Sequence, residues 1–271
     1  MSERPGSPRG DQPRIVDVSG LTLKGQPLQV AVVTPYHREP TDWLTQCIAS
    51  VAAQSYPCTH FLVADGFPRP ELMPAAAQHI VLPRAHADNG NTPRAIGSLS
   101  AIGQGYDAIA YLDADNWYEP GFVEAMVKLQ AVTGAAFCSA GRGIHRPDGS
   151  LLLVDTTESN ARTLVDTSCM FLMRRAFAVV PVWALMPKQM SAACDTVFFR
   201  AVIARQLPRA HEPRTLVAFR TSYAAHYAAA GETAPAGTKT IDETERCFEW
   251  WRGLKPEERA AWDRILGGPP L

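Results

Sequence analysis

The sequence predicts an α/β protein with a mostly parallel central sheet and a mixed, partly antiparallel C-terminal half. Two observations carry this prediction. In the first 130 residues, short runs rich in β-branched residues alternate with segments whose apolar residues recur at helical spacing. In addition, residues 108–112 are apolar throughout, as a strand buried on both faces of a parallel sheet must be.

The elements can be assigned in order along the chain. Strands are expected at residues 29–34, 59–64, 79–82 and 108–112, and then near 136–139, 151–154 and 216–220. Helices are expected at residues 41–54, from Thr92 to Gly103 or Gly105, from Pro120 onward, and at 242–266 with a break at Pro256. We therefore treat the chain from about residue 28 onward as one domain, preceded by a flexible tail over residues 1–27.

Composition excludes several classes of protein. A formal net charge of −1, from 26 basic and 27 acidic side chains, gives no field that would gather nucleic acid, so no nucleic-acid partner is expected. The six cysteines form no C-x-x-C pair and suggest neither a zinc knuckle nor a disulfide framework. No run of about 18 apolar residues is long enough to span a bilayer as a helix. We expect a cytoplasmic protein without a transmembrane segment, and peripheral membrane association is left open.

Polar residues follow three of the expected strands at the point where each strand ends. Thr34, Pro35 and Tyr36 end the first strand, Asp65 the second, and Asp113-Ala114-Asp115 the strand at 108–112. In an open parallel sheet, ligands bind beyond the carboxyl ends of the strands. The sequence therefore predicts one binding rim at this edge.

The D-x-D segment is the chemically most informative part of this rim. Asp113 and Asp115 flank one small residue after a buried strand, so they can hold a hard divalent cation and leave coordination positions for phosphate oxygens. D-x-D alone is a weak signal, because aspartates in turns commonly accept hydrogen bonds from backbone amides. Its position after an apolar strand favours function.

Four segments resemble, in order, the successive motifs of glycosyltransferase family 2. They are VAVVTPYHREPTDWLTQCIASVAAQ at residues 30–54, VADG at 63–66, NGNTPR at 89–94 and AYLDADNW at 110–117. The resemblance covers roughly residues 28–226 and is firmest up to about 130. It implies a glycosyltransferase A fold, which is Rossmann-like, and a nucleoside-diphosphate sugar as donor.

The resemblance also implies a division of the chain and a set of binding residues. Residues 28–130 would be the nucleotide-binding half, 131–230 the acceptor-binding half, and 231–271 a helical extension packed on the domain. Ala64 stands where many relatives carry a first aspartate, so the base stays open between uracil and guanine. The residues implied to bind the nucleotide sugar are Thr34, Pro35, Tyr36, Asp65, Asn89, Arg94, Asp113, Ala114 and Asp115.

Two further residues acquire roles from the same resemblance. Asp195, in CDTVFFR at residues 194–200, matches the aspartate that acts as catalytic base, although an aspartate there could also cap the following helix. His226 matches a histidine that, in some of these enzymes, completes a site for Mn²⁺ or Mg²⁺ with Asp113 and Asp115. A core or surface histidine is an equally good interpretation of His226.

The expected reaction is transfer of a sugar to a carbohydrate or other hydroxyl acceptor, with inversion at the anomeric carbon. Retention remains open, because the same fold serves both outcomes. A sugar-phosphate nucleotidyltransferase would need a glycine-rich basic loop after the first strand, and residues 34–39 do not supply one. A non-catalytic nucleotide- or carbohydrate-binding module is the remaining alternative, against which the presence of Asp113, Asp115 and Asp195 argues.

Overall fold

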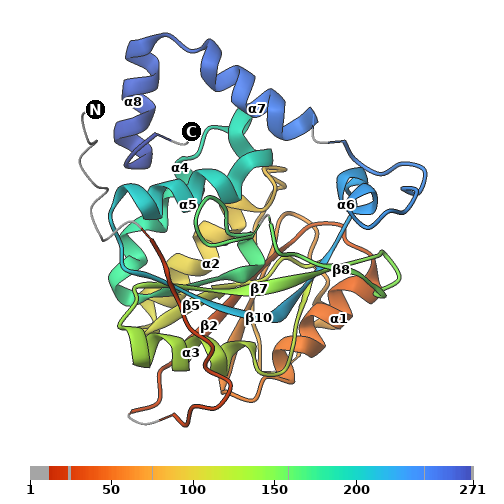
Figure 1. Cartoon of the computed structure of the whole chain (residues 1–271), viewed down its shortest axis with the longest axis vertical. Coiled ribbons are helices and arrows are strands. Elements are labelled where there is room, and N and C mark those ends of the chain that lie inside the picture. Colours follow the sequence, from red (N-terminus) through yellow and green to blue (C-terminus); the bar gives the residue numbers. More distant parts are fainter. Residues whose placement is uncertain (1–11, 24–25, 75, 158, 241, 270–271) are drawn as a thin grey trace, which may run out of the picture.

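A computed structural model of the chain describes residues 12–23, 26–74, 76–157, 159–240 and 242–269. Within these residues one ten-stranded sheet runs through the centre of the molecule, with helices on both faces (Figure 1). The strands follow the order β1-β10-β7-β9-β5-β2-β3-β4, while β6 pairs with β10 and β8 with β7. The predicted α/β class is confirmed.

Most of the predicted elements begin and end close to where the sequence placed them, whereas β7 extends beyond the expected 136–139 and β1, β6, β9 and α4 were not assigned. The strands are β1 (Arg14–Ile15), β2 (Val30–Tyr36), β3 (Cys58–Ala64), β4 (Gln78–Val81), β5 (Ala108–Tyr111), β6 (Trp117–Tyr118), β7 (Phe137–His145), β8 (Leu151–Val154), β9 (Met170–Met173) and β10 (Arg209–Arg220). The α-helices are α1 (Thr41–Ala52), α2 (Asn91–Gly103), α3 (Phe122–Thr133), α4 (Pro181–Leu185), α5 (Cys194–Ala204), α6 (Ala224–Ala229), α7 (Asp242–Gly253) and α8 (Pro256–Leu266). The 3-10 helices are η1 (Pro70–Leu72), η2 (Thr167–Cys169), η3 (Arg174–Val179) and η4 (Lys188–Ala193).

The first half of the chain forms the parallel part of the sheet. Strands β4, β3, β2 and β5 are parallel neighbours, and every residue of β2 and β5 is buried. Strand β9 then runs antiparallel between β5 and β7, which gives the mixed half that the less regular C-terminal sequence predicted. Because β2, β3 and β5 are parallel, their carboxyl ends meet at one edge of the sheet.

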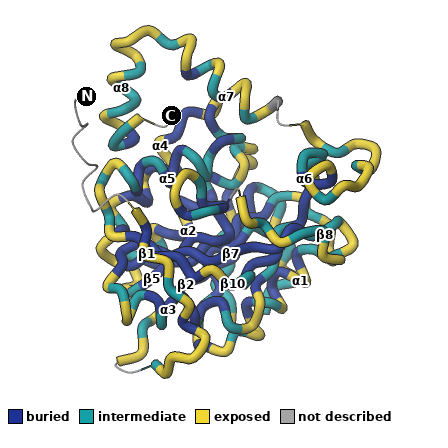
Figure 2. The backbone as a smooth tube through the Cα atoms, in the orientation of Figure 1, coloured by how far each residue is buried: buried dark blue, intermediate teal, exposed yellow. Residues whose placement is uncertain are grey.

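Helices cover the two faces unequally. Helices α1 and α3 lie on one face, α2, α4 and α5 on the other, and α7 and α8 lie beyond α4 and α5 (Figure 1). The sheet is buried between them, whereas α7 and α8 are mostly exposed (Figure 2). Cys247, Trp251 and Leu266 nevertheless belong to the main core, because α7 packs on η4 and α8 on α4. No helix in the described ranges combines the length and apolar character needed to cross a membrane.

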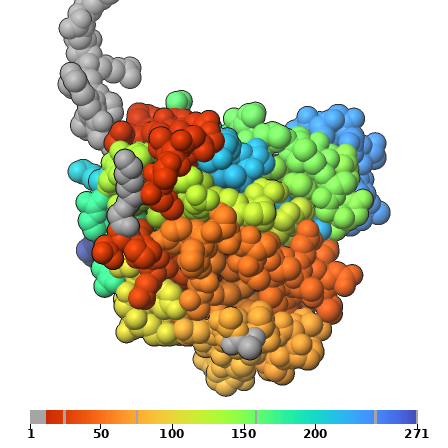
Figure 3. Space-filling model, turned by 90° about the horizontal axis from the view of Figure 1, so that it is seen from below, coloured from red at the N-terminus to blue at the C-terminus, as the bar shows by residue number. Residues whose placement is uncertain are grey.

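The N-terminal segment differs from the flexible tail that was expected over residues 1–27. Strand β1 pairs in parallel with β10, and the amide of Val18 donates to the carboxylate of the fully buried Glu212, at 2.8 Å. The Val18 side chain is fully buried, and the space-filling view shows this segment against the body of the domain (Figure 3). The burial of Val18 and its hydrogen bond to the Glu212 carboxylate therefore fix residues 14–18 on the domain. Residues 1–11 and 24–25 lie outside the described residues.

Strand β10 is longer than the expected strand at 216–220. It begins at Arg209 and its pairing with β7 shifts register between Glu212 and Thr215. Pro213 falls within this bulge, where its missing N–H breaks no ladder hydrogen bond. A proline in a strand pattern favours a boundary, which is why the first part of β10 could not be read from the sequence.

Helix α2 packs closely on the sheet at Gly97. A Cβ on Gly97 would lie 2.7 Å from Val33 Cγ1 and 2.9 Å from Val63 Cγ2, so Gly97→Ala is expected to lower the free energy of unfolding by about 1–3 kcal/mol. Gly103→Ala, at the end of the same helix, meets no neighbouring atom within 4 Å and should be neutral or stabilising by up to about 1 kcal/mol. Urea unfolding of the two variants measures the contrast, and equal stabilities would contradict it.

Candidate active site

The carboxyl ends of β2, β3 and β5 open into a cavity of about 700 Å³. Its wall combines residues between positions 35 and 115 with residues from η4, α5, β10 and α6. The predicted site residues that line it are Pro35, Tyr36, Asp65, Asn89, Arg94, Asp113, Asp115, Asp195 and His226. These nine residues, of which Pro35 is the first and His226 the last, span about 190 residues of sequence and are gathered around one cavity.

Thr34 and Ala114 differ from the prediction, because neither lines the cavity. Thr34 is fully buried and its hydroxyl hydrogen-bonds with Nε2 of His60 at 2.8 Å, inside the sheet. Ala114 belongs to a small apolar cluster with Tyr36 and Leu44. Thr34 lies before the end of β2, within the buried sheet, whereas Pro35 and Tyr36 are the last two residues of the strand and both reach the cavity. Tyr36 lines the cavity, although its hydroxyl bonds to Nε2 of His79 at 2.7 Å.

Asp113 is held by a buried arginine. Nη2 of Arg94, from the first turns of α2, donates to Oδ1 of Asp113 at 2.5 Å, and Nη1 donates to the Asn89 carbonyl at 2.8 Å. Only 4% of the Arg94 side chain is exposed, compared with 26% of that of Asp113. Proximity to Asp113 raises the Arg94 pKa against the opposing effect of burial, so the guanidinium remains charged. The predicted nucleotide contact of Arg94 therefore also fixes the first aspartate of D-x-D.

In the part of the chain that the structure describes, the Asp115 carboxylate forms no such ion pair, although its backbone is fixed. Nε of Arg220, at the end of β10, donates to the Asp115 carbonyl at 3.0 Å, while the guanidinium lies between the rings of Trp43 and Trp117. Burial raises the pKa of Asp115 to about 7, and the nearby charges of Asp113 and Glu39 act in the same direction. A carboxylate in such surroundings favours the arrival of a cation.

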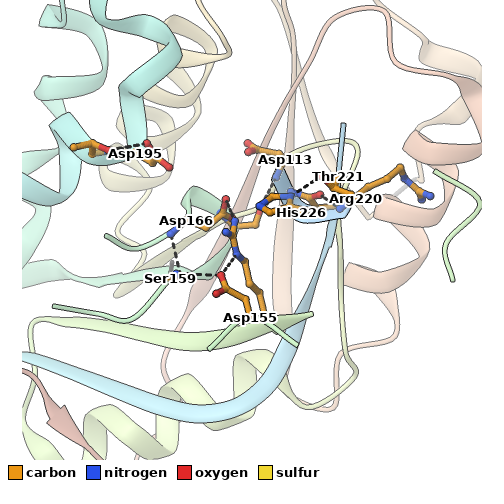
Figure 4. Close-up of polar contacts among 12 residues, drawn as sticks. Asp113, Asp155, Ser159, Asp166, Asp195, Arg220, Thr221 and His226 are labelled. Carbon is orange, nitrogen blue, oxygen red and sulfur yellow. Dashed lines mark hydrogen bonds and ion pairs between the residues drawn. The ribbon is translucent and has the colours of Figure 1, made fainter. Parts of the chain in front are cut away.

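The donor set agrees with a shared metal site rather than a complete protein cage. Within the described ranges, no group of three or more His, Cys, Asp or Glu side chains is preassembled around a metal position. Mg²⁺ and similar ions commonly bind one or two carboxylates together with substrate phosphates, and Asp113 and Asp115 match this pattern. Nδ1 of the buried His226 hydrogen-bonds with Thr221 at 2.6 Å, and a bond at one ring nitrogen is what orients metal-binding imidazoles (Figure 4).

Asp195 lies across the cavity at the start of α5. It lies in the first turn of the helix, whose N-cap is Ala193, so the helix-capping alternative does not apply; its Oδ1 accepts the backbone N–H of Thr196 at 2.6 Å, and the residue lines the cavity. Burial raises the pKa of Asp195, against the opposing effects of the Thr196 hydrogen bond and the Arg142 charge. A carboxylate with a raised pKa is a better proton acceptor than an exposed aspartate.

Arg142 is a site residue that the sequence analysis missed. From β7 it donates to Asp155 at 2.7 Å and to Asp166 at 2.8 Å, the two carboxylates labelled in Figure 4, and it lines the cavity with Asp166. Burial raises the pKa of Asp166 to about 6, although Arg142 opposes this effect. In the sequence Arg142 lies between two glycines and shows no periodic or motif signal, so only the pairing of β7 with β10 could place it here.

The segment after β10 supplies a wall that was also missed. Tyr223, Lys239 and Glu243 line the cavity, and the Lys239 amide donates to the Ser222 carbonyl at 2.6 Å. Residues 222–240 carry no strand or helix pattern strong enough to predict that they fold back over the sheet edge.

Asp65 is engaged by the loop between β4 and α2. Its Oδ1 accepts the amide of His86 at 2.9 Å and also hydrogen-bonds with the His86 ring, and its Oδ2 accepts the amide of Ala87 at 3.1 Å. Burial by itself raises the Asp65 pKa, but these hydrogen bonds outweigh it and the pKa lies below its ordinary value. Both carboxylate oxygens of Asp65, one of the residues predicted to bind the nucleotide sugar, therefore already accept hydrogen bonds within the protein.

Comparison with known proteins gives a family match over part of the chain, and a fold. Residues 31–153 match the family described as Glycosyl transferase family 2. The crystal structure of S. aureus TarS 1-349 in complex with UDP aligns with a TM-score of 0.53 and 11% identity, covering 87% of this chain and 78% of that one. The structure of TarS 1-349 in complex with UDP-GlcNAc aligns with a TM-score of 0.55 and 13% identity, covering 88% of this chain and 70% of that one.

A further S. aureus TarS structure aligns with a TM-score of 0.53 and 11% identity. That alignment covers 87% of this chain and 47% of the TarS chain. No curated protein sequence gives a significant match. The likeness to these structures confirms the glycosyltransferase A type of fold, because at such identities only the architecture is compared.

The raised pKa of Asp115 predicts that the stability of the metal-free protein depends on pH. Its folded-state pKa of about 7 lies above the ordinary 3.8, so its stabilising contribution is complete below about pH 4 and is lost as the pH rises through about 7. Between these limits a single titrating carboxyl changes the free energy of unfolding by at most about 1.4 kcal/mol per pH unit. Urea unfolding with a chelator, from about pH 5 to about pH 8, should show a free energy of unfolding that falls with pH.

Asp115→Asn is expected to flatten this profile, because the amide does not titrate. Asp17→Asn, at an exposed position remote from the cavity, should leave the profile unchanged. The assignment to Asp115 would be wrong if both variants kept the wild-type slope.

Proposed function

We propose that the chain, whose residues 31–153 match the model of Glycosyl transferase family 2, transfers a sugar, with inversion, from a UDP- or GDP-sugar to a carbohydrate or other hydroxyl acceptor. The observation that supports this most directly is that Asp113, Asp115 and Asp195 line one cavity. The first two end a buried strand and the third starts a helix on the other side of the sheet edge. The TarS structures carry UDP and UDP-GlcNAc, which favours a uridine donor as the first to be tested.

The residues at the end of β5 would bind the diphosphate. Asp115, with Asp113 and His226, would hold Mn²⁺ or Mg²⁺, and the bound ion would neutralise charge that develops on the departing diphosphate. Arg94 holds Asp113 in place, and Arg220 holds the carbonyl of Asp115. Both arginines thus pre-organise the turn before the donor binds. Charges that are already in place stabilise the charge developing in the transition state better than charges that must first reorient.

Asp195 would act as the base. In an inverting transfer the acceptor oxygen forms its bond to the anomeric carbon while the bond to the diphosphate oxygen breaks, and the acceptor proton passes to the base. A carboxylate whose pKa is raised by burial holds that proton more readily than an exposed one. The Thr196 amide fixes one oxygen of Asp195, which leaves the group oriented at the helix start.

Replacement of Asp195 by Asn tests its role as the base. The asparagine oxygen can still accept the Thr196 amide, so the fold and nucleotide affinity should persist while kcat falls by at least about 100-fold. Transfer from UDP- and GDP-sugars measures kcat, and calorimetry with the diphosphates measures affinity. Asp17→Asn is a matched control, because Asp17 also accepts a backbone amide, that of Ser19, at an exposed position. Unchanged turnover in Asp195→Asn would remove this residue from the mechanism.

Removal of the divalent ion tests the metal proposal. Transfer should stop in excess chelator and return with Mn²⁺ or Mg²⁺, because the diphosphate leaving group would otherwise carry uncompensated charge. Asp115→Asn should raise the metal concentration needed for half-maximal activity by about tenfold or more. Full activity in chelator would contradict the assignment of Asp113, Asp115 and His226.

A further inference from the structure

A buried side chain joins the D-x-D turn to the end of β10. Asn116, the residue after Asp115, is 1% exposed and does not line the cavity. Its Nδ2 donates to Oγ of Ser168, in η2, at 2.9 Å, and its Oδ1 accepts the backbone amide of Arg220 at 2.8 Å. One amide group therefore connects the turn to two segments that lie far from it in the sequence.

Ser168 holds both ends of the D-x-D turn. Its fully buried hydroxyl oxygen accepts the backbone amide of Asp113 at 3.2 Å as well as the Asn116 side chain. Ser168 is itself held in place, because its amide donates to Oδ1 of Asp166 at 2.9 Å, and Oδ2 of Asp166 accepts from Arg142 at 2.8 Å. The side chains of Ser168 and Asn116, here called the bridge, thus fix the turn from its first residue to its last.

The bridge also reaches the segment that carries His226. Nε of Arg220 donates to the Asp115 carbonyl at 3.0 Å, so Arg220 contacts the turn both through this bond and through its backbone amide. The next residue, Thr221, is buried, and its hydroxyl hydrogen-bonds with Nδ1 of His226 at 2.6 Å. The position of His226 relative to the D-x-D turn therefore depends on the two buried side chains of the bridge.

We propose that Asn116 and Ser168 are positioning residues, which set the distance between the D-x-D turn and the segment that carries the histidine. This inference rests on the proposed function, in which Asp113, Asp115 and His226 hold the divalent ion. Neither side chain of the bridge touches the ion. Metal ligands that are already in place bind more tightly, because less conformational freedom is lost on binding. Loss of the bridge therefore lowers the affinity for the ion although all three ligands are still present.

Binding of Mn²⁺ by variants of the bridge tests the proposal. Ser168→Ala removes one oxygen atom, and Asn116→Ala removes the amide group that links η2 to β10. Each is expected to weaken Mn²⁺ binding by about tenfold at a fixed excess of UDP, as is usual when a residue that orients a metal ligand is lost. The double variant should bind at most about threefold more weakly than the weaker single variant, because both changes break the same bridge. Water-proton relaxation, which reports Mn²⁺ bound to protein, measures the affinity without catalysis.

Ser139→Ala is the matched control, because Ser139 is also fully buried and its hydroxyl hydrogen-bonds with Nδ1 of His211 at 2.9 Å, outside the lining of the cavity. It should lower the melting temperature, as Ser168→Ala does, but keep the Mn²⁺ affinity within about twofold of wild type. The proposal is overturned if Ser168→Ala binds Mn²⁺ like wild type, if Ser139→Ala weakens binding equally, or if the two bridge effects multiply in the double variant. Ser168→Ala decides alone where Asn116→Ala does not fold. If the wild-type protein binds no Mn²⁺ with either UDP or GDP, it is the proposed function that fails.

Discussion

The ion pair between Arg94 and Asp113 is the interaction on which the arrangement of the site depends. It joins the start of α2 to the end of β5 through an arginine that also packs on Trp183, with 5.1 Å between the guanidinium carbon and the ring centroid. Removing one partner of such a buried pair costs roughly 3–5 kcal/mol, because the other charge is left without compensation. Among the described residues the Asp115 carboxylate forms no ion pair with an arginine, so it is the aspartate of the turn with the less compensated charge.

The charge of the cavity as a whole fits a ligand that is itself a complex of a cation and an anion. Carboxylates in its wall outnumber lysines and arginines; they are Glu39, Asp65, Asp88, Asp113, Asp115, Asp166, Asp195 and Glu243, against Arg94, Arg142, Arg220 and Lys239. Arg94 and Arg142 are engaged by carboxylates, and Arg220 donates to two carbonyls and to Gln46. A bare anion would meet repulsion here, whereas a metal-bound diphosphate brings its own compensation.

The sequence predicted the part of the site that lies on strand ends, for a physical reason. Runs such as residues 108–112 are apolar because both faces of a central strand are covered, and the first polar residue after the run marks the sheet edge. Neither the last buried residue of a strand nor the direction of each side chain could be predicted, which is why Thr34 and Ala114 were assigned to the wrong surface. Arg142, Tyr223 and Lys239 could not be found, because they reach the cavity through pairing and chain reversal over long sequence separations.

The attachment of residues 14–18 has a consequence for the solubility of the protein. Strand β10 has β7 on one side, and along Ala210 and His211 its other side is covered by β1. A strand with a bare row of amides and carbonyls offers a template on which a second molecule can add its own strand. A shortened chain lacking this cover would expose that row together with the buried Glu212, and self-association would then compete with folding.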